Sequence, residues 1–389
     1  MIKRYLEDHV RQDIADKMVF ISGPRQVGKT TLAKELGRKH FPDSCSYLNW
    51  DNRRDRKAIL SGEFEAGNRL VIFDEIHKYK NWKNYLKGEY DKYRDKFSIV
   101  VTGSARLDLY RRGGDSLLGR YHAYRLHPLS VAELAGNDKS ITPHKELIFS
   151  GARKEEFKKL FSYGGFPEVC LKHDVRLLRR WHNERTDLLI REDIRDIEAI
   201  RDISALQVLV DVLPDKVGSL FSINSLKEDL QVTHKTVASW VDVLEKFYYH
   251  YRIYPFQSSR IKSLRKEPKL YLWDWSEIED EDIRLENLIA SHLLKLCHFL
   301  HDVEGYDAKL YYIRDKEQRE VDFLVCIEKK PWFCVEVKAS FRELPVSLKY
   351  FSTHLKIPFS YLVIGEEGID YLKDSIRIIS ASKFLGTLV

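Results

Sequence analysis

A short segment near the amino terminus constrains this chain most, because its glycine spacing is tied to one backbone geometry and one ligand chemistry. Residues 23–30 read G-P-R-Q-V-G-K-T, after an apolar run at 18–21 and before a helix-favouring stretch at 31–36. This is the G-x-x-x-x-G-K-T spacing of a phosphate-binding P-loop between a strand and a helix. A glycine turn before an ordinary helix is the plainer alternative, and the complete pattern in this context favours the P-loop.

We expect this loop to bind a nucleotide with Mg²⁺. Its glycines let backbone N–H groups surround the phosphates, Lys29 neutralises the β and γ oxygens, and the Thr30 hydroxyl ligates Mg²⁺. The predicted nucleotide-binding set is Gly23, Pro24, Arg25, Gln26, Val27, Gly28, Lys29, Thr30 and Thr31.

A second apolar strand, predicted at 69–73, ends in the two acids Asp74 and Glu75. Next to a P-loop, Asp74 would hold Mg²⁺ through its water shell, and Glu75 would polarise the water that attacks the γ-phosphate. Acids are common caps of buried strands, so this pattern alone is weak. In combination with the P-loop it predicts nucleotide hydrolysis.

Two further residues are candidates for the same reaction. A buried strand at 97–102 leads to Ser104, which we predict to sense the γ-phosphate, with Thr102 as the alternative and a simple hydroxyl cap as the plainer one. Arg120 has the position of an arginine finger that would reach the phosphates of a neighbouring subunit. An ordinary surface arginine would give the same pattern.

Composition sets the broad class. A chain of 389 residues exceeds one ordinary core, which predicts two or three domains. Lys and Arg number 65 against 59 Asp and Glu, and this mild excess does not by itself identify a nucleic-acid partner. The five cysteines lack a C-x-x-C pair, and the chain has neither a membrane-length apolar run nor a signal-peptide core. We therefore expect a cytoplasmic protein with reduced thiols and no membrane partner.

The order of predicted elements suggests four domains. Strands and helices alternate up to about residue 135, which predicts a parallel α/β sheet. A largely helical lid or connector follows, interrupted at 164–167, and then a winged helix and a second α/β region. The predicted boundaries are 1–140, 141–215, 216–269 and 270–389.

The winged-helix prediction rests on helices at 222–230 and 235–245 and a strand at 248–255. We predict DNA contact through the second helix and a basic wing. The predicted contact residues are Lys235, Thr236, Ser239, Arg260, Lys262, Arg265 and Lys266. Lys269 is predicted to belong to the same wing. The alternative is a protein-docking module, since such folds serve both purposes. Trp240 and Val243 are expected in its core.

The last region carries a second set of acids. Asp322 lies on one predicted strand, and Glu336 and Lys338 share one face of its hairpin partner. Asp322 and Glu336 would hold Mg²⁺ and Lys338 would help activate water against a phosphodiester, with Glu286 as a further ligand from a helix. A salt-bridged hairpin is the alternative.

With these residues in place, the chain resembles a family of prokaryotic AAA+-related P-loop ATPases that carry a C-terminal domain of unknown function similar to restriction endonucleases. The matching motifs are those at 23–31, F-D-E-I-H at 73–77, T-G-S-A at 102–105, L-G-R at 118–120, L-H-P-L-S at 126–130, Y-G-G-F-P-E at 163–168, E-V-D-F at 320–323 and V-E-V-K at 335–338.

The resemblance implies an AAA+-like parallel sheet with a helical lid, a winged helix and a C-terminal restriction-endonuclease-like α/β domain. It implies ATP as the nucleotide, hydrolysed through Lys29, Thr30, Asp74 and Glu75, and nuclease-like acids at Asp322 and Glu336 with Lys338. We expect an ATPase that acts on DNA, assembles as a homo-oligomer and carries a Mg²⁺-dependent nuclease activity. The alternative is a nucleotide-dependent switch or scaffold that binds a protein partner and has an inactive nuclease-like fold.

Overall fold

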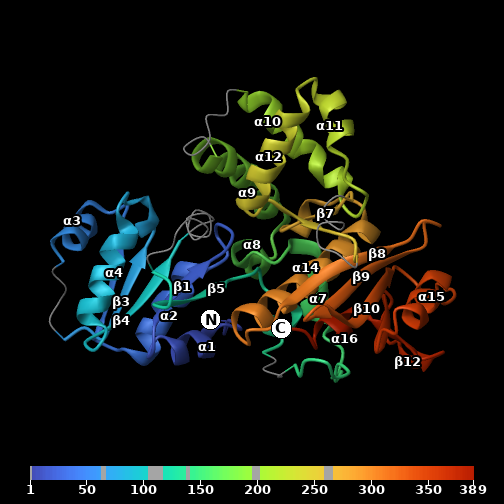
Figure 1. Ribbon diagram of the computed structural model, residues 1–389, viewed down its shortest axis with the longest axis horizontal. Coiled ribbons are helices and arrows are strands. Elements are labelled where there is room, and N and C mark those ends of the chain that lie inside the picture. Colours follow the sequence, from blue (N-terminus) through green and yellow to red (C-terminus); the bar gives the residue numbers. More distant parts are fainter. Residues whose placement is uncertain (1, 63–66, 104–116, 137–140, 195–201, 258–265) are drawn as a thin grey trace. The chain divides into compact units, whose positions relative to one another are not determined.

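A computed structural model of the protein describes residues 2–62, 67–103, 117–136, 141–194, 202–257 and 266–389 (Figure 1). The chain divides into two compact units, Met1–His127 and Pro128–Val389, which we describe separately. The finer division into four domains remains a prediction. Within the described ranges, no helix has the length and apolar character needed to cross a membrane.

The first unit is built on a five-stranded sheet in the order β2-β3-β4-β1-β5. All neighbouring strands are parallel; they are β1 (Met18–Ser22), β2 (Cys45–Asn49), β3 (Leu70–Asp74), β4 (Ser98–Thr102) and β5 (Tyr121–Arg125). Every residue of β1 and β3 is buried, which is why both strands read as continuous apolar runs. The carboxyl ends of the strands meet at one edge of the sheet, where the predicted nucleotide-binding residues follow.

Helix α1 (Glu7–Asp13) precedes β1, and three further helices lie between strands of the sheet; they are α2 (Lys29–His40), α3 (Arg53–Ser61) and α4 (Trp82–Tyr93). The α3 helix begins after Asn52, whose side chain accepts hydrogen bonds from the N–H groups of Arg54 and Asp55. The α4 helix contributes Trp82 and Leu86 to an apolar layer with Phe20 and Phe73 from the sheet. This layer fixes the strands that carry the site.

The second unit begins with helices and a two-stranded sheet. Its first elements are α6 (Val131–Leu134), α7 (Lys154–Tyr163), α8 (Pro167–Lys172), α9 (Val175–Leu188), α10 (Ile203–Val212), α11 (Ile223–Leu230), α12 (His234–Lys246), β6 (His250–Ile253) and β7 (Lys269–Leu272). The predicted interruption lies between α7 and α8, where Gly164 has φ 73°. A Cβ there would approach Asp274 Oδ1 to 2.6 Å, so the turn requires glycine.

The C-terminal part of this unit holds a six-stranded sheet in the order β12-β13-β11-β10-β9-β8. Its elements are α14 (Glu281–Asp302), β8 (Ala308–Arg314), β9 (Glu320–Ile327), β10 (Lys330–Lys338), α15 (Val346–His354), β11 (Phe359–Ile364), β12 (Asp370–Lys373), β13 (Ile376–Ser380) and α16 (Ala381–Leu385). The strands β8, β9 and β10 form an antiparallel meander, whereas β11 runs parallel to both β10 and β13.

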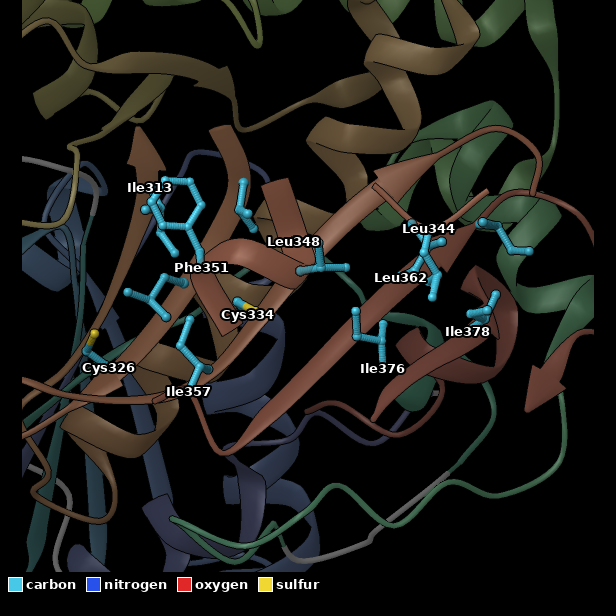
Figure 2. Close-up of a cluster of buried hydrophobic side chains, with 13 residues drawn as sticks. Ile313, Cys326, Cys334, Leu344, Leu348, Phe351, Ile357, Leu362, Ile376 and Ile378 are labelled. Carbon is cyan, nitrogen blue, oxygen red and sulfur yellow. The ribbon is translucent and has the colours of Figure 1, made fainter. Parts of the chain in front are cut away.

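Apolar side chains from this sheet pack against α15 (Figure 2). Cys334 of β10, Leu362 of β11 and Ile378 of β13 belong to the same buried cluster as Leu348 and Phe351 of the helix. The layer gives the hairpin of β9 and β10 a rigid support.

The long helix α14 is held by polar contacts at a buried histidine. His292 donates from Nδ1 to Leu288 O at 2.8 Å and accepts the Val131 N–H at Nε2 at 3.1 Å. Burial lowers the pKa of His292 to about 3. The neutral ring therefore ties the segment around α6 to α14.

Candidate functional site

The predicted P-loop connects β1 to α2 and has the backbone that its glycines indicate. Gly28 has φ 98° and Gln26 has φ 62°. Gly23 has φ 141°, and a Cβ there would lie 2.4 Å from Leu126 O, so only glycine fits. The N–H groups of the loop and the first turn of α2 form an anion-binding end of a helix, which suits a phosphate chain.

Lys29 is buried at the start of α2. Its Nζ donates to Gly23 O at 3.0 Å and to Pro24 O at 2.6 Å. Both acceptors belong to the loop itself, so the ammonium group lies against the backbone that would surround the phosphates.

Asp74 lies at the carboxyl end of β3 and accepts hydrogen bonds from three hydroxyl groups. Thr30 Oγ1 donates to Asp74 Oδ2 at 2.9 Å, and Thr102 Oγ1 donates to Asp74 Oδ1 at 2.6 Å. The third donor is Tyr47, whose phenol lies 2.7 Å from Oδ2. The hydroxyl and carboxylate oxygens that the sequence assigned to Mg²⁺ are thus adjacent, and hard oxygen ligands of this kind fit that ion.

The strand order explains this convergence. Because β4 is inserted between β1 and β3, Thr102 is paired with Asp74 in the sheet. Thr102, the alternative that the sequence offered, is fully buried and contacts the acid. Ser104, the first choice for the phosphate sensor, lies outside the described residues.

Glu75 follows Asp74 in a left-handed conformation with φ 57°, and its N–H donates to Thr102 O at 3.0 Å. Its carboxylate lies 3.5 Å from His77 Nε2 and 3.6 Å from Lys78 Nζ. Burial raises the pKa of Glu75, and the Lys78 ammonium opposes that rise. A carboxylate with a raised pKa is suited to take a proton from water.

Arg4 is a buried residue of this site that the sequence analysis missed. Its guanidinium donates from Nη1 to Val27 O in the P-loop at 2.8 Å, and from Nη2 to His127 O. It therefore braces the loop against the segment that follows β5. Nothing in the local pattern of residues 2–8 indicates this, because both acceptors are distant in sequence.

Arg120, predicted as an arginine finger, lies at the opposite edge of the same sheet. Its carbonyl accepts the N–H of Met18, the first residue of β1, whereas the P-loop follows the last. Its guanidinium forms a bidentate ion pair with Asp91 of α4, at 2.7 and 3.1 Å. Arg120 therefore does not serve the P-loop of its own unit, and its role toward a neighbouring subunit remains a prediction.

The second predicted set of acids comes together at the hairpin of β9 and β10. Phe323 pairs with Val335, which places Asp322 opposite Glu336 on one face of the sheet. Asp322 Oδ2 accepts the Val337 N–H at 2.9 Å. Lys338 Nζ lies 2.8 Å from Glu336 Oε1.

Two of the predicted acids interact electrostatically with Asp322. Burial, and next the charge of Asp322, raise the pKa of Glu336 to about 8. The same two causes, in the same order, raise the pKa of Glu286, on α14, to about 7. Glu286 of the helix and Glu336 of the hairpin therefore each interact with Asp322.

These residues fit a divalent cation in one respect. Glu336 is 6% exposed, and its Oε2 has no hydrogen-bond partner among the described residues. In the part of the chain that the structure describes, no three His, Cys, Asp or Glu side chains are arranged to hold a metal ion. Mg²⁺ is usually held by one or two carboxylates together with waters and substrate phosphates, and Asp322 and Glu336 supply two.

The expectation for Lys269 is wrong. The sequence placed it in an exposed basic wing, but it is 3% exposed and its Nζ lies 2.6 Å from Glu320 Oε1. Burial of an ammonium group requires such a partner.

The other predicted DNA-binding residues are placed as follows. Lys235 and Ser239 are exposed on α12, whereas Trp240 and Val243 of the same helix are buried as expected. The remaining members are Thr236, whose hydroxyl contacts the capping Thr233; Lys266, which is exposed; and Arg260, Lys262 and Arg265, which lie outside the described residues.

The first unit thus has the parallel sheet and phosphate-binding loop of a P-loop NTPase. The AAA domain family matches residues 15–135, which include the P-loop and the strand that ends at Asp74. This match supports a relationship to AAA-type ATPases. Two families described only as domains of unknown function, DUF8612 and DUF4143, match residues 154–276 and 284–384.

Several proteins are similar in sequence to this chain over most of its length. The uncharacterized protein MJ1544 of Methanocaldococcus jannaschii is 25% identical, over 92% of this chain and 84% of that protein. A second protein of that organism, the uncharacterized protein MJ1637, is 23% identical over 76% of this chain and 72% of its own length. The uncharacterized protein Rv2008c of Mycobacterium tuberculosis is 22% identical over 95% and 81%.

Two solved structures have weak similarity to this chain. The Holliday junction branch migration motor RuvB of Thermotoga maritima is 18% identical, with a TM-score of 0.31 over 64% of this chain and 90% of that chain. AMPPCP-bound DnaA of Aquifex aeolicus is 14% identical, with a TM-score of 0.32 over 62% and 86%. Because both scores are low, the function proposed below rests on this chain's own residues.

Proposed function

We propose that the protein binds and hydrolyses ATP with Mg²⁺ at the P-loop of its first unit. The observation that carries this proposal is the contact of Asp74 with Thr30, which brings the predicted metal-binding carboxylate to the helix turn that carries Lys29. ATP, rather than GTP, comes from the resemblance to AAA+-related ATPases.

The residues of this site have distinct roles in the proposed reaction. The loop N–H groups and Lys29 bind the phosphates, and Thr30 and Asp74 orient the oxygens that bind Mg²⁺. The ion, when bound, neutralises charge that develops on the phosphate oxygens. Glu75 takes the proton of the attacking water, for which its raised pKa is suited. Thr102 keeps the Asp74 carboxylate in one orientation.

Replacement of Glu75 by Gln tests the assignment of the base. The amide keeps the shape of the side chain but accepts no proton, so we expect a variant that binds a fluorescent ATP analogue as the wild type does and releases at least about 100-fold less phosphate. Glu89→Gln, on α4, is the matched control, because Glu89 is a half-buried carboxylate with a raised pKa outside the site. Wild-type turnover in Glu75→Gln would contradict the role.

A second activity is favoured by the carboxylates of the other unit. We propose that Asp322 and Glu336 hold Mg²⁺ and that Lys338 assists the cleavage of a DNA phosphodiester. The unpartnered Glu336 Oε2 supports this proposal, because a buried carboxylate oxygen otherwise has a hydrogen-bond donor. The element order α14, β8, β9, β10, with Glu286 on α14, is in keeping with the restriction-endonuclease-like fold that we propose for this part of the chain.

Incubation of linear duplex DNA with Mg²⁺ and protein tests the nuclease proposal. We expect cleavage by the wild type and none by Asp322→Asn or Lys338→Met. Lys309→Met, a change in a half-buried lysine paired with Asp307, should leave cleavage intact. Equal cleavage by all four proteins would assign the activity to another site or to a contaminant.

Contact with DNA is proposed for α12 and the segment that follows β6, as a winged helix. The exposed Lys235 and Ser239 lie on the solvent side of α12, opposite the buried Trp240. Lys235→Ala should weaken DNA binding and reduce its dependence on salt. ATP turnover that does not respond to DNA, together with no DNA binding, would instead favour a nucleotide-dependent switch acting on a protein partner.

A further inference from the structure

Lys269 is the first residue of β7, and it reaches into the carboxylates of the proposed metal site. Its Nζ lies 2.6 Å from Glu320 Oε1, 3.7 Å from Glu286 Oε1 and 3.7 Å from Asp322 Oδ1. The three acceptors come from α14 and from β9. One ammonium group is therefore shared by three carboxylates of two different elements.

The surroundings hold this ammonium group in place. Tyr271, two residues further along β7, donates from its hydroxyl to Glu286 Oε1 at 2.7 Å, and Arg314 donates to Glu320 Oε2 at 2.7 Å. Since Lys269 is 3% exposed, water does not screen these charges strongly. The three carboxylates around Nζ therefore form a position that favours a positive charge.

Asp322 connects this position to the rest of the cluster. Its Oδ1 faces Lys269, and the sheet register places it beside Glu336, whose Oε2 lacks a hydrogen-bond partner among the described residues. Two-metal sites for phosphoryl transfer hold their ions about 3.5–4 Å apart and share a carboxylate between them. Here Asp322 has the place of such a carboxylate. Lys269 lies on one side of it, and Glu336 Oε2, which lacks a hydrogen-bond donor among the described residues, lies on the other.

The charges of the cluster point the same way. The four carboxylates of Glu286, Glu320, Asp322 and Glu336 meet three cationic groups, from Lys269, Arg314 and Lys338. One divalent cation would reverse the remaining negative charge, and a second would add strong repulsion in a region that is largely buried.

We infer that Lys269 occupies the position of a second divalent cation, so that this cluster binds one divalent ion, at Asp322 and Glu336, instead of two. The inference rests on the metal site proposed above. Lys269 then sets the number of metal ions that the cluster binds. This role explains why the lysine is buried among three acids, as a DNA-contacting residue would not be.

Counting bound Mn²⁺ tests this inference without any measurement of cleavage. The full chain, free of nucleotide, is titrated with Mn²⁺ and the free ion is followed by electron paramagnetic resonance; ions lost in Asp322→Asn are assigned to the cluster. We expect one such ion in the wild type and two in Lys269→Met. Lys269→Arg, which keeps the charge, and Lys309→Met, a control in which the lysine pairs with Asp307 instead of with the cluster, should each retain one.

The outcomes separate the two proposals. Two Asp322-dependent ions in the wild type would overturn the role of Lys269 and leave the metal site standing. No Asp322-dependent ion in the wild type would refute the metal site itself. A folded Lys269→Met that still binds one ion would also overturn the inference. If Lys269→Met does not fold, Lys269→Gln, whose amide still donates to Glu320, takes its place with the same expected count of two.

Discussion

Replacement of Thr102 by Val gives the sharpest single test of how the sheet positions Asp74. The two side chains have nearly the same shape, so the change removes one hydroxyl from a fully buried position. That hydroxyl lies 2.6 Å from Asp74 Oδ1. A hydrogen bond to a charged group contributes about 1.5–3 kcal/mol, which corresponds to a roughly 10- to 100-fold lower rate if the bond orients the carboxylate in the transition state.

Phosphate release at saturating ATP, measured over a range of Mg²⁺ concentrations, gives the result directly. We expect Thr102→Val to lose turnover by this factor while Thr102→Ser, which retains the hydroxyl, stays within about threefold of the wild type. Turnover of the Val variant equal to that of the wild type would refute the positioning role. An equal loss in both variants would assign the effect to packing of the methyl group instead.

Three further predictions concern the scaffold of the two units. Arg4→Met should lower nucleotide affinity by about 10-fold or more, because the P-loop loses a charged brace; titration with a fluorescent nucleotide measures it, and affinity equal to that of Arg11→Met, an exposed change on α1, would contradict the brace. Gly23→Ala should abolish nucleotide binding in the same titration, since its Cβ meets a carbonyl oxygen at 2.4 Å, whereas Gly88→Ala, where a Cβ meets nothing within 4 Å, should bind normally. Burial lowers the pKa of His292 to about 3 in the folded state, whereas in the unfolded chain its pKa is near the ordinary value of about 6.5. As the pH is lowered from about 6.5 to about 3, only the unfolded chain binds the proton, so the free energy of unfolding decreases, by at most about 1.4 kcal/mol per pH unit. In urea unfolding measured at several pH values, the free energy of unfolding of His292→Gln should decrease less on acidification than that of the wild type. An equal decrease in the two proteins would contradict the role of His292.

Local sequence patterns predicted those site residues whose roles depend only on their near neighbours in the chain. The spacing of Gly23, Gly28 and Lys29 is set by the backbone that a phosphate requires, so it is readable without tertiary structure. The same holds for the paired acids Asp74 and Glu75, which end a continuously apolar strand. The alternation of the strand that carries them likewise predicted that Glu336 and Lys338 share one face, and the two side chains form an ion pair on β10.

Contacts set by strand order were less accessible from the sequence. The insertion of β4 beside β3 makes Thr102 a partner of Asp74, and the pairing of β2 with β3 brings Tyr47 to the same carboxylate. The parallel pairing of β1 and β5 moves Arg120 to the edge away from the P-loop. None of these follows from periodicity, because each depends on which strands become neighbours.

Charge pattern alone also misplaced one residue. Lys269 lies in a run of basic residues that reads as an exposed wing, yet its side chain is buried among acids that are 17 to 53 positions later in the chain. A sequence shows the sign of a charge but not its burial, which depends here on the packing of β7 against α14 and β9.

The central claim is that the P-loop of the first unit hydrolyses ATP. The most direct test is Mg²⁺-dependent phosphate release from ATP by the purified full chain and by its Lys29→Ala variant, with folding of both confirmed by thermal unfolding. The account predicts steady turnover by the wild type and turnover at the level of the protein-free control in the variant, because the loop loses the cation that neutralises the phosphates. Equal turnover by the two proteins, or none by the wild type in Mg²⁺, would contradict it.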